Sequence, residues 1–177
     1  AQAAGVALGV ITPVFRDLER LGFLRTTKAR GRTLERTTEL QDAWVEGYLR
    51  DLRPRLHPRR FRVARARWWE AEDWTGVEAW LGGEPAAALL TKRLVPQDAV
   101  LYEGGGFAPL ARRIRPAKDE RGNLEVLDKF WNFEIPPPGP HPRLAPPLLV
   151  YADLVATGDA RNLEAAEAIR ERFLARA

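Results

Sequence analysis

The stretch ITPVFRDLERLGFLRTTKARGRTLER, residues 11–36, decides the fold of the N-terminal part of the chain. Apolar side chains recur every three or four residues, which predicts a helix over about residues 8–21 with one buried stripe. Gly22 follows this repeat at a place where helices commonly end. Two threonine-containing arms, 23–27 and 33–36, then flank a basic turn with a glycine, which predicts a β-hairpin. The predicted stripe consists of Ile11, Val14, Phe15, Leu18 and Leu21.

The residues before this helix complete the pattern of a helix-turn-helix. Ala1–Ala4 are typical of the end of an earlier helix, and Gly5 permits the left-handed turn between the two helices. A helix-turn-helix followed by a basic hairpin is the arrangement of a winged helix. Because the chain contains no methionine, we expect residues upstream of it. We therefore expect residues 1–36 to be a truncated winged helix-turn-helix that lacks its first helix.

One side of the predicted helix and the basic hairpin are the expected contacts with double-stranded DNA. In winged helices the second helix enters the major groove, while the hairpin lies along phosphates. Few polar groups lie on this side of the helix, so DNA shape would supply much of any specificity. The alternative is a module of the same fold that binds only protein. The expected DNA-binding residues here are Gly9, Thr12, Arg16, Arg20, Lys28, Arg30 and Arg32.

Residues 37–67 are predicted to connect this part to the rest of the chain. Thr38 and Gln41 have the spacing of a capping box, which predicts the start of a helix, and Pro54 is expected to end it. Apolar residues recur every four positions along this helix, which favours core packing over a dimer contact. They are Leu40, Trp44, Tyr48 and Leu52.

An arginine-rich run follows at residues 53–67, with seven arginines and no acidic residue. Alternation around Arg60, Arg62 and Val63 suggests a strand. The run is either a second phosphate-binding strip that includes Arg59, or a solvated linker between domains. The sequence leaves both interpretations open.

Charge is distributed unevenly along the chain, whose formal net charge is +4. Residues 1–67 carry 15 basic and 7 acidic side chains, whereas residues 68–177 carry 13 and 17. A basic N-terminal part beside an acidic remainder indicates a polyanionic partner for the former. The excess of arginine over lysine suits phosphate contact, but it is equally typical of a GC-rich genome.

Composition also excludes several classes of protein. The chain has no cysteine, so disulfides, thiolate nucleophiles and cysteine-based metal sites are excluded. Its two histidines are far apart in sequence, which argues against an imidazole metal site. The opening residues lack the pattern expected of a signal peptide, and the sequence contains no long apolar run. We therefore expect a cytoplasmic protein without a metal, a cofactor or a membrane contact.

Residues 68–177 have the pattern of a small mixed α/β domain, so the whole chain is expected to be α+β or α/β. Four tryptophans lie within 13 residues and are interpreted as core anchors, with an aromatic cage or a base-stacking platform as the alternative. A proline- and glycine-rich stretch at 136–147 is expected to be a surface loop. Strands are expected at 100–102 and 124–127, and helices at 85–94, 148–156 and 162–177, the last with Leu163, Ala166, Ile169, Phe173 and Leu174 inward.

Four acidic residues could in principle carry chemistry: Glu84, Glu103, Asp128 and Asp153. A metal-dependent nuclease would need two or three of them to converge, but their spacing matches no recognisable motif. Structural roles are the simpler interpretation: Glu84 and Asp153 would cap helices or pair with Arg161 in the core, and Asp159 would cap the last helix. The glycine-rich segment 102–107 lacks the lysine of a phosphate-binding loop and is expected to be a flexible surface loop.

Two segments resemble the AbiEi family of antitoxins. They are Gly82-Gly83-Glu84-Pro85-Ala86-Ala87 and a tail from Leu149 to Glu167 that contains Tyr151, Asp153, Gly158, Asp159, Arg161 and Asn162. The resemblance implies a transcriptional regulator of a type IV toxin–antitoxin system, built from a winged helix and an α/β antitoxin domain. It further implies a non-enzymatic protein that represses its own operon and counters a nucleotidyltransferase-like toxin without forming a stable complex with it. A homodimer is one option for its oligomeric state.

Overall fold

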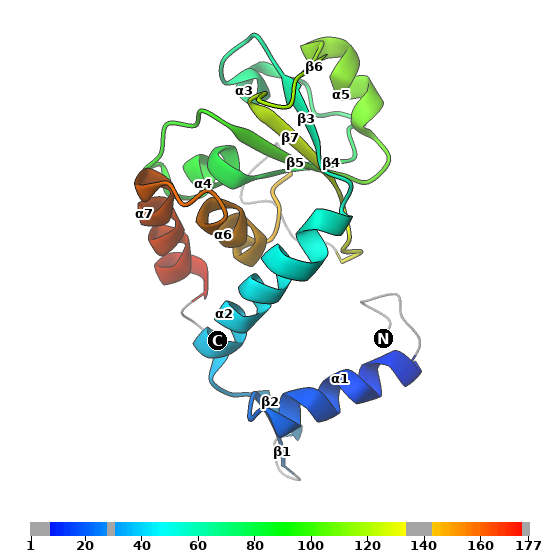
Figure 1. Cartoon of the computed structure of the whole chain (residues 1–177), viewed down its shortest axis with the longest axis vertical. Coiled ribbons are helices and arrows are strands. Elements are labelled where there is room, and N and C mark those ends of the chain that lie inside the picture. Colours follow the sequence, from blue (N-terminus) through cyan, green and yellow to red (C-terminus); the bar gives the residue numbers. More distant parts are fainter. Residues whose placement is uncertain (1–7, 28–30, 134–142, 175–177) are drawn as a thin grey trace.

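The computed structural model describes residues 8–27, 31–133 and 143–174. A five-stranded sheet with helices packed on it forms the body, and helix α2 (Thr37–Gly47) leads from this body to a smaller head, whose described residues form a helix and a hairpin (Figure 1). The expected mixed α/β fold class is confirmed.

The head contains the predicted helix and hairpin. Helix α1 spans Leu8–Arg20, and strands β1 (Leu24–Thr27) and β2 (Gly31–Leu34) pair in antiparallel fashion. Gly22 joins them with a φ of +76°, a conformation that glycine adopts without strain. The expected earlier helix at Ala1–Ala4 and the hairpin turn at 28–30 lie outside the described residues.

The apolar residues of α1 are only partly covered. Ile11, Phe15 and Leu18 are half-buried toward the hairpin, but Val14 is 52% exposed and Leu21 is 49% exposed. The prediction of a single buried stripe is therefore wrong for these two residues. Among the described residues of the head, a two-stranded hairpin offers too little surface to enclose both flanks of the helix.

The helix that leads to the body begins and ends differently from the prediction. Arg36 precedes α2 in the left-handed conformation and its side chain does not cap the helix, while Thr38 lies inside the helix, so the expected capping box is wrong. The helical path also continues past α2 through a π turn (Tyr48–Leu52) and a 3₁₀ turn (Arg53–Arg55) that contains Pro54. We call residues 37–55 the connector helix. Tyr48 is buried as expected, and so is the nearby Val45, whereas Trp44, also expected in the core, is 36% exposed.

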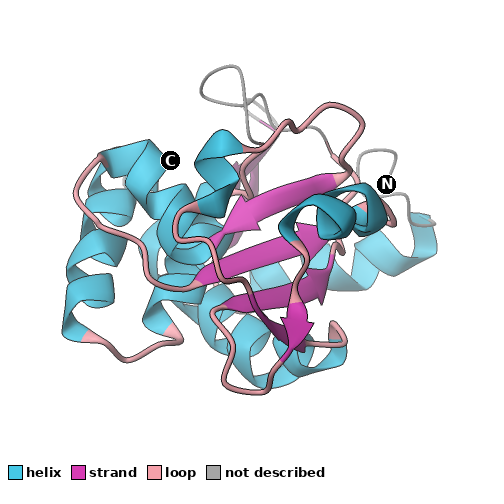
Figure 2. Ribbon diagram, turned by 90° about the horizontal axis from the view of Figure 1, so that it is seen from above, coloured by secondary structure: helices cyan, strands magenta, loops and turns pink. Residues whose placement is uncertain are grey.

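The body is organised around a mixed sheet (Figure 2), whose strand order is β4-β5-β7-β3-β6. The central pair β5 and β7 is parallel and every other pair is antiparallel. Strand β3 comes from the arginine-rich run, so the interpretation of that run as a solvated linker is wrong, and the body's sheet begins before residue 68. The strands are β3 (Arg59–Arg62), β4 (Ala79–Gly82), β5 (Ala99–Glu103), β6 (Ala117–Lys118) and β7 (Leu124–Asp128).

Three helices pack together on one side of the sheet, and two shorter ones lie near strands β3 and β6 (Figure 1). The helices expected in the body were located correctly, but α3 and α5 were not predicted, and α5 follows directly on the glycine-rich turn. No helix in the described ranges is both long and apolar enough to cross a membrane. The three helices that pack together are α4 (Gly83–Thr91), α6 (Pro147–Val155) and α7 (Ala160–Ile169). A π turn (Arg170–Leu174) follows α7. The two shorter helices are α3 (Trp68–Ala71) and α5 (Phe107–Ile114).

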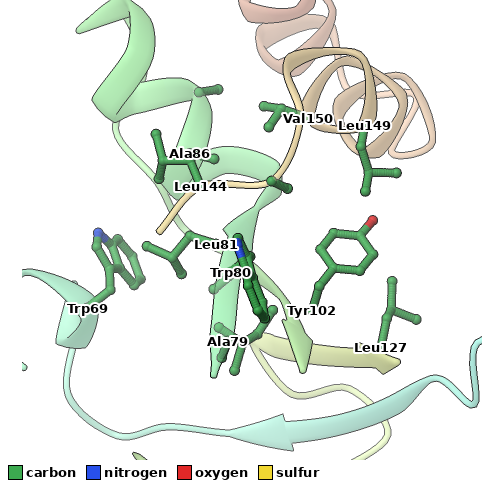
Figure 3. Close-up of a cluster of buried hydrophobic side chains, with 14 of the residues drawn as sticks. Trp69, Ala79, Trp80, Leu81, Ala86, Tyr102, Leu127, Leu144, Leu149 and Val150 are labelled. Carbon is green, nitrogen blue, oxygen red and sulfur yellow. The ribbon is translucent and has the colours of Figure 1, made fainter. Parts of the chain in front are cut away.

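The core fills the space between the sheet and these helices. The four clustered tryptophans are all buried, as predicted. Figure 3 shows Tyr102 rising from the sheet beside Leu149, with its hydroxyl directed toward α6. Two expectations about burial are wrong. Leu163, expected inward, is 41% exposed, and Leu144, expected in a surface loop, is 7% exposed because it forms a β-bridge with Leu81.

Candidate DNA interface and the polar centre of the body

The exposed side of α1 carries the predicted helix contacts. Gly9, Thr12, Arg16 and Arg20 recur every three or four residues, so they lie along one side of the helix, and all four are exposed. Arg16 has no ion pair with any described residue. Arg20 lies 3.4 Å from Asp17, but both side chains are at least 65% exposed. Such a pair is weak enough to leave the arginine available for a phosphate.

The hairpin packs against α1 through one of its basic residues. The Arg32 guanidinium lies 4.2 Å from the centre of the Phe15 ring, which places this cation beside α1. The Thr26 hydroxyl donates a hydrogen bond of 2.6 Å to Glu19 and links the hairpin to the same helix. The other two predicted hairpin contacts, Lys28 and Arg30, lie outside the described residues.

The remaining predicted DNA contacts are in the body, away from the head (Figure 1). Strand β3 carries Arg59, Arg60 and Arg62, and each finds an acidic partner on a neighbouring strand or turn. Arg59 pairs with Glu103 and Asp128, Arg60 lies 3.8 Å from Glu125, and Arg62 lies 2.6 Å from Asp119. The structure therefore brings these arginines together with carboxylates of their own sheet and not with α1 or the hairpin.

A buried carboxylate ties α4 to α7. Glu84, in the first turn of α4, is 5% exposed. It accepts hydrogen bonds of 2.9 Å from Arg161 and 2.9 Å from Asn162, and one of 2.6 Å from the backbone N–H of Gln97. The expected pairing of Glu84 with Arg161 is confirmed. Asp159 also caps α7 as predicted, since its side chain accepts from the backbone N–H groups of Arg161 and Asn162.

A second buried carboxylate lies between α6, the sheet and the connector helix. Asp153 accepts 2.7 Å from the Tyr102 hydroxyl and 3.1 Å from the Gly83 backbone N–H, and a 2.7 Å bond joins the hydroxyls of Tyr102 and Tyr48. Burial raises the pKa of Asp153 to about 7, although the nearby Arg53 works in the opposite direction. Sequence reasoning missed the tyrosines and Arg53, because residues about 50 positions apart share no local pattern.

The close approach of Asp153 to α4 depends on the paired glycines. A Cβ atom on Gly82 would lie 2.5 Å from a carboxylate oxygen of Asp153, and Gly83 has a φ of +51°. The two segments that resemble the AbiEi family therefore meet in space. Gly83 contacts Asp153, and the adjacent Glu84 contacts Arg161 and Asn162. Their shared role is to join α4, α6 and α7 through buried polar contacts.

Arg53 stands at the centre of the remaining charges. Its guanidinium lies 2.5 Å from Glu125 and 3.8 Å from Asp153, and these acids raise its pKa further above the ordinary range despite its partial burial. A cavity of about 130 Å³ adjoins this cluster, and its lining includes Arg53, Arg60, Gly83, Glu125 and Asp153.

The four acids considered for catalysis have partners of their own. Glu103 and Asp128 share Arg59, and Asp128 also contacts the His57 ring at 2.7 Å. Glu84 and Asp153 belong to the two buried contacts above. In the described ranges no three histidine or acidic side chains are grouped as a bound metal would require.

Comparison with known proteins places the chain in a family. A family model described as "Transcriptional regulator, AbiEi antitoxin, Type IV TA system" matches residues 33–175, which is most of the chain. No curated protein and no solved structure matches it. The match begins within β2 and includes the connector helix and the body, whereas α1 and β1 precede it. The chain therefore belongs to the AbiEi antitoxin family of transcriptional regulators from type IV toxin–antitoxin systems.

Proposed function

We propose that this regulator binds double-stranded DNA through its head and thereby represses its own operon in the cytoplasm. The observation that carries this proposal is the clustering of exposed arginines on the head; Arg20 has an acidic partner, Asp17, but that pair is itself exposed. Arg16 and Arg20 project from one exposed side of α1, and Arg32 is held beside that helix by Phe15. Guanidinium groups on a helix and an adjacent hairpin suit contacts with phosphates on either side of a groove.

Arg32 and Arg16 also contrast with the arginines of the body. Arg59, Arg60 and Arg62 are engaged by acids of the sheet, so we assign the DNA contact to the head alone. By their position in the sequence, Lys28 and Arg30 belong to the predicted turn of this hairpin, and we include them in the proposed DNA contact. The body would then supply the antitoxin activity, which we propose to be non-enzymatic and indirect.

A DNA-binding experiment tests the first part. We expect the Arg16→Ala/Arg32→Ala double variant to bind a duplex containing its own promoter about tenfold more weakly at moderate salt, because two phosphate contacts are lost. The slope of log affinity against log salt should become shallower by about 2, one for each lost contact. Fluorescence anisotropy across a salt series measures both quantities.

The matched control changes the charge of the body by the same amount. Arg112 and Arg121 are exposed, and neither has a side-chain ion pair with a described residue. The Arg112→Ala/Arg121→Ala variant should therefore bind as the unaltered chain does. Equal weakening by both double variants would mean that net charge rather than the head governs binding, and would overturn the assignment.

The second candidate is a head that binds protein. Val10 is 57% exposed, and Val14 and Leu21 are about half exposed, so an apolar flank of α1 is uncovered by the described residues. Such a flank suits a protein contact, a second copy of the chain included. This candidate gains support if the unaltered chain shows no salt-dependent DNA binding and sediments as a dimer that Val14→Asp dissociates.

The antitoxin part has a separate test. Co-expression of the full chain with the toxin encoded beside it should restore growth, and purification of the tagged chain should recover no stoichiometric toxin. Recovery of a stable complex that survives gel filtration would contradict the proposed indirect action. The double variant Arg16→Ala/Arg32→Ala should still restore growth, because the head and the body have different tasks in this proposal.

A further inference from the structure

Helix α7 and the turn that follows α4 form one edge of the body, at the left of Figure 1. Arg161, at the start of α7, donates a hydrogen bond of 2.9 Å to the Val95 carbonyl. Arg172, just past the end of α7, donates one of 2.8 Å to the Leu90 carbonyl. Because these bonds lie at both ends of α7, the helix and the turn form one continuous surface. We call residues 89–96 and 160–172 the α4–α7 edge.

The half of this edge that α7 supplies is acidic. Exposed positions recur every three or four residues from 160 to 171 and form the outer face of the helix. Leu163 lies on this face and is 41% exposed. Glu164 and Glu171, also on it, have no ion pair with a described residue, and Glu167 is 63% exposed at 3.7 Å from Arg170. The outer face of α7 is therefore an exposed leucine beside glutamates that remain available to a partner.

The half that α4 and its turn supply is apolar, with cations around it. Leu89 is 42% exposed, and Val95 is 73% exposed, the largest exposed fraction among the large apolar side chains that the structure describes. Both line a hollow of about 290 Å³, whose wall also includes Lys92 and Arg93. These two cations are exposed and have no ion pair with a described residue. An exposed apolar surface of this kind is typical of a protein contact.

The two halves of the edge complement each other. An exposed leucine beside glutamates matches an apolar hollow beside a lysine and an arginine. The acid in the wall of the hollow, Glu70, is already paired with Arg67 at 2.5 Å, so it does not oppose an incoming carboxylate at full strength. A surface whose two halves are complementary can pair with its own copy across a two-fold axis, which is the arrangement of a closed dimer.

We propose that two copies of this chain associate through the α4–α7 edge, with α7 of each copy against the hollow beside α4 of the other. Leu163 of one copy enters the hollow of the second, while Glu164 and Glu167 face Lys92 and Arg93 there. The contact is made twice, once on each side of the axis. Removal of the exposed apolar side chains from water drives the association, and the opposite charges fix its orientation.

A second copy fits this surface better than an unrelated protein does, because both complementary halves are present on the same edge of one chain. The edge includes neither α1 nor the hairpin (Figure 1), so the contact uses none of the residues assigned to DNA. A pair of chains would carry two heads related by two-fold symmetry. The use of both heads on DNA rests on the proposed function, whereas the association itself does not.

Exchange of charges on the full chain tests this inference. Sedimentation equilibrium should show that the unaltered chain forms a dimer that weakens as salt increases. The Lys92→Glu/Arg93→Glu variant makes both halves acidic, and the Glu164→Lys/Glu167→Lys variant makes both basic. Each variant alone should associate at least about tenfold more weakly, because like charges then face each other. An equimolar mixture of the two should recover the dimer, because opposite charges again meet in both contacts.

Two controls separate the contact from other effects. The Arg112→Glu/Arg121→Glu variant has the same net charge as Lys92→Glu/Arg93→Glu but leaves the edge unchanged, so alone it should associate as the unaltered chain does. Mixed with Glu164→Lys/Glu167→Lys it should pair more weakly than Lys92→Glu/Arg93→Glu does, since one of the two contacts stays repulsive. Leu163→Asp, which changes an exposed apolar position, should also weaken the dimer at least about tenfold.

Four results would overturn the inference. They are an unaltered chain that stays monomeric at the highest concentration reached, a dimer that the charge variants leave intact, a mixture that recovers no dimer, and a dimer that Val14→Asp dissociates. The last result would assign the association to the exposed flank of α1. A dimer that binds no DNA would refute only the proposed function, and DNA binding by a chain that remains monomeric would refute only the proposed dimer.

Discussion

Replacement of Gly82 by alanine is expected to lower the free energy of unfolding by about 3 kcal/mol, which is the upper range for overpacking a closed core. The new methyl group would lie 2.5 Å from an oxygen of Asp153 and 2.8 Å from the Tyr102 ring. Neither neighbour can retreat easily, because Asp153 is bonded to Tyr102 and Gly83 and both side chains are buried. Urea unfolding followed by circular dichroism measures the change.

Gly47 offers a matched control for the same substitution. It lies at the end of α2 with helical dihedral angles, and a Cβ atom there would meet nothing within 4 Å. Gly47→Ala should therefore raise stability by about 0.5–1 kcal/mol, because alanine loses less backbone entropy in a helix. If the two variants changed stability equally, the close packing around Gly82 would not be the cause of its effect.

Local patterns predicted the parts of this fold that local physics determines. The period of the apolar residues located α1, short apolar segments located α6, β5 and β7, and Asp159 was correctly expected to cap α7. The pairing of Glu84 with Arg161 was also among the expected structural roles. In each instance the signal lies within one element or rests on the need to pair a buried charge.

The errors arise where distant parts of the chain decide the outcome. Arg36 takes the place expected for a threonine cap because its guanidinium bonds the Leu21 carbonyl at 3.1 Å in the head. Val14 and Leu21 follow the apolar period, but the described part of the head has no third layer to cover them. Helix α5 begins after three glycines, which disfavour a helix locally, while its Phe107, Leu110 and Ile114 are drawn into the core.

The candidate DNA contacts also divide into those that local sequence patterns placed and those whose surroundings are decided by distant parts of the chain. Periodicity alone placed Gly9, Thr12, Arg16 and Arg20 on one exposed side of α1. The arginines at 59, 60 and 62 have the same composition as a phosphate-binding strip, and only the pairing of β3 with β7 and β6 brings acids to them. A count of charges along the sequence cannot separate arginines that face a partner molecule from those that balance their own sheet.

Removal of Arg53 is expected to be nearly as damaging as Gly82→Ala. Arg53→Ala would leave Glu125, which is 7% exposed, and the fully buried Asp153 without their nearest cation. A buried carboxylate stripped of its partner costs about 3 kcal/mol or more. The pKa of Asp153 should also rise further, because Arg53 is the charge that lowers it. The loss of stability should therefore be larger at pH 8 than at pH 6, where Asp153 is mostly neutral.

Arg55 provides the control, since it lies two residues away in the same 3₁₀ turn and is exposed. Arg55→Ala removes an equal charge from the connector helix but uncovers no buried acid, so its effect on the free energy of unfolding should stay within about 0.5 kcal/mol at either pH. Chemical unfolding at pH 6 and pH 8 measures the change in the free energy of unfolding that each of the two variants causes. An equal, pH-independent loss in Arg53→Ala and Arg55→Ala would mean that the buried acids do not depend on Arg53, and that the connector helix is held to the body by its apolar contacts alone.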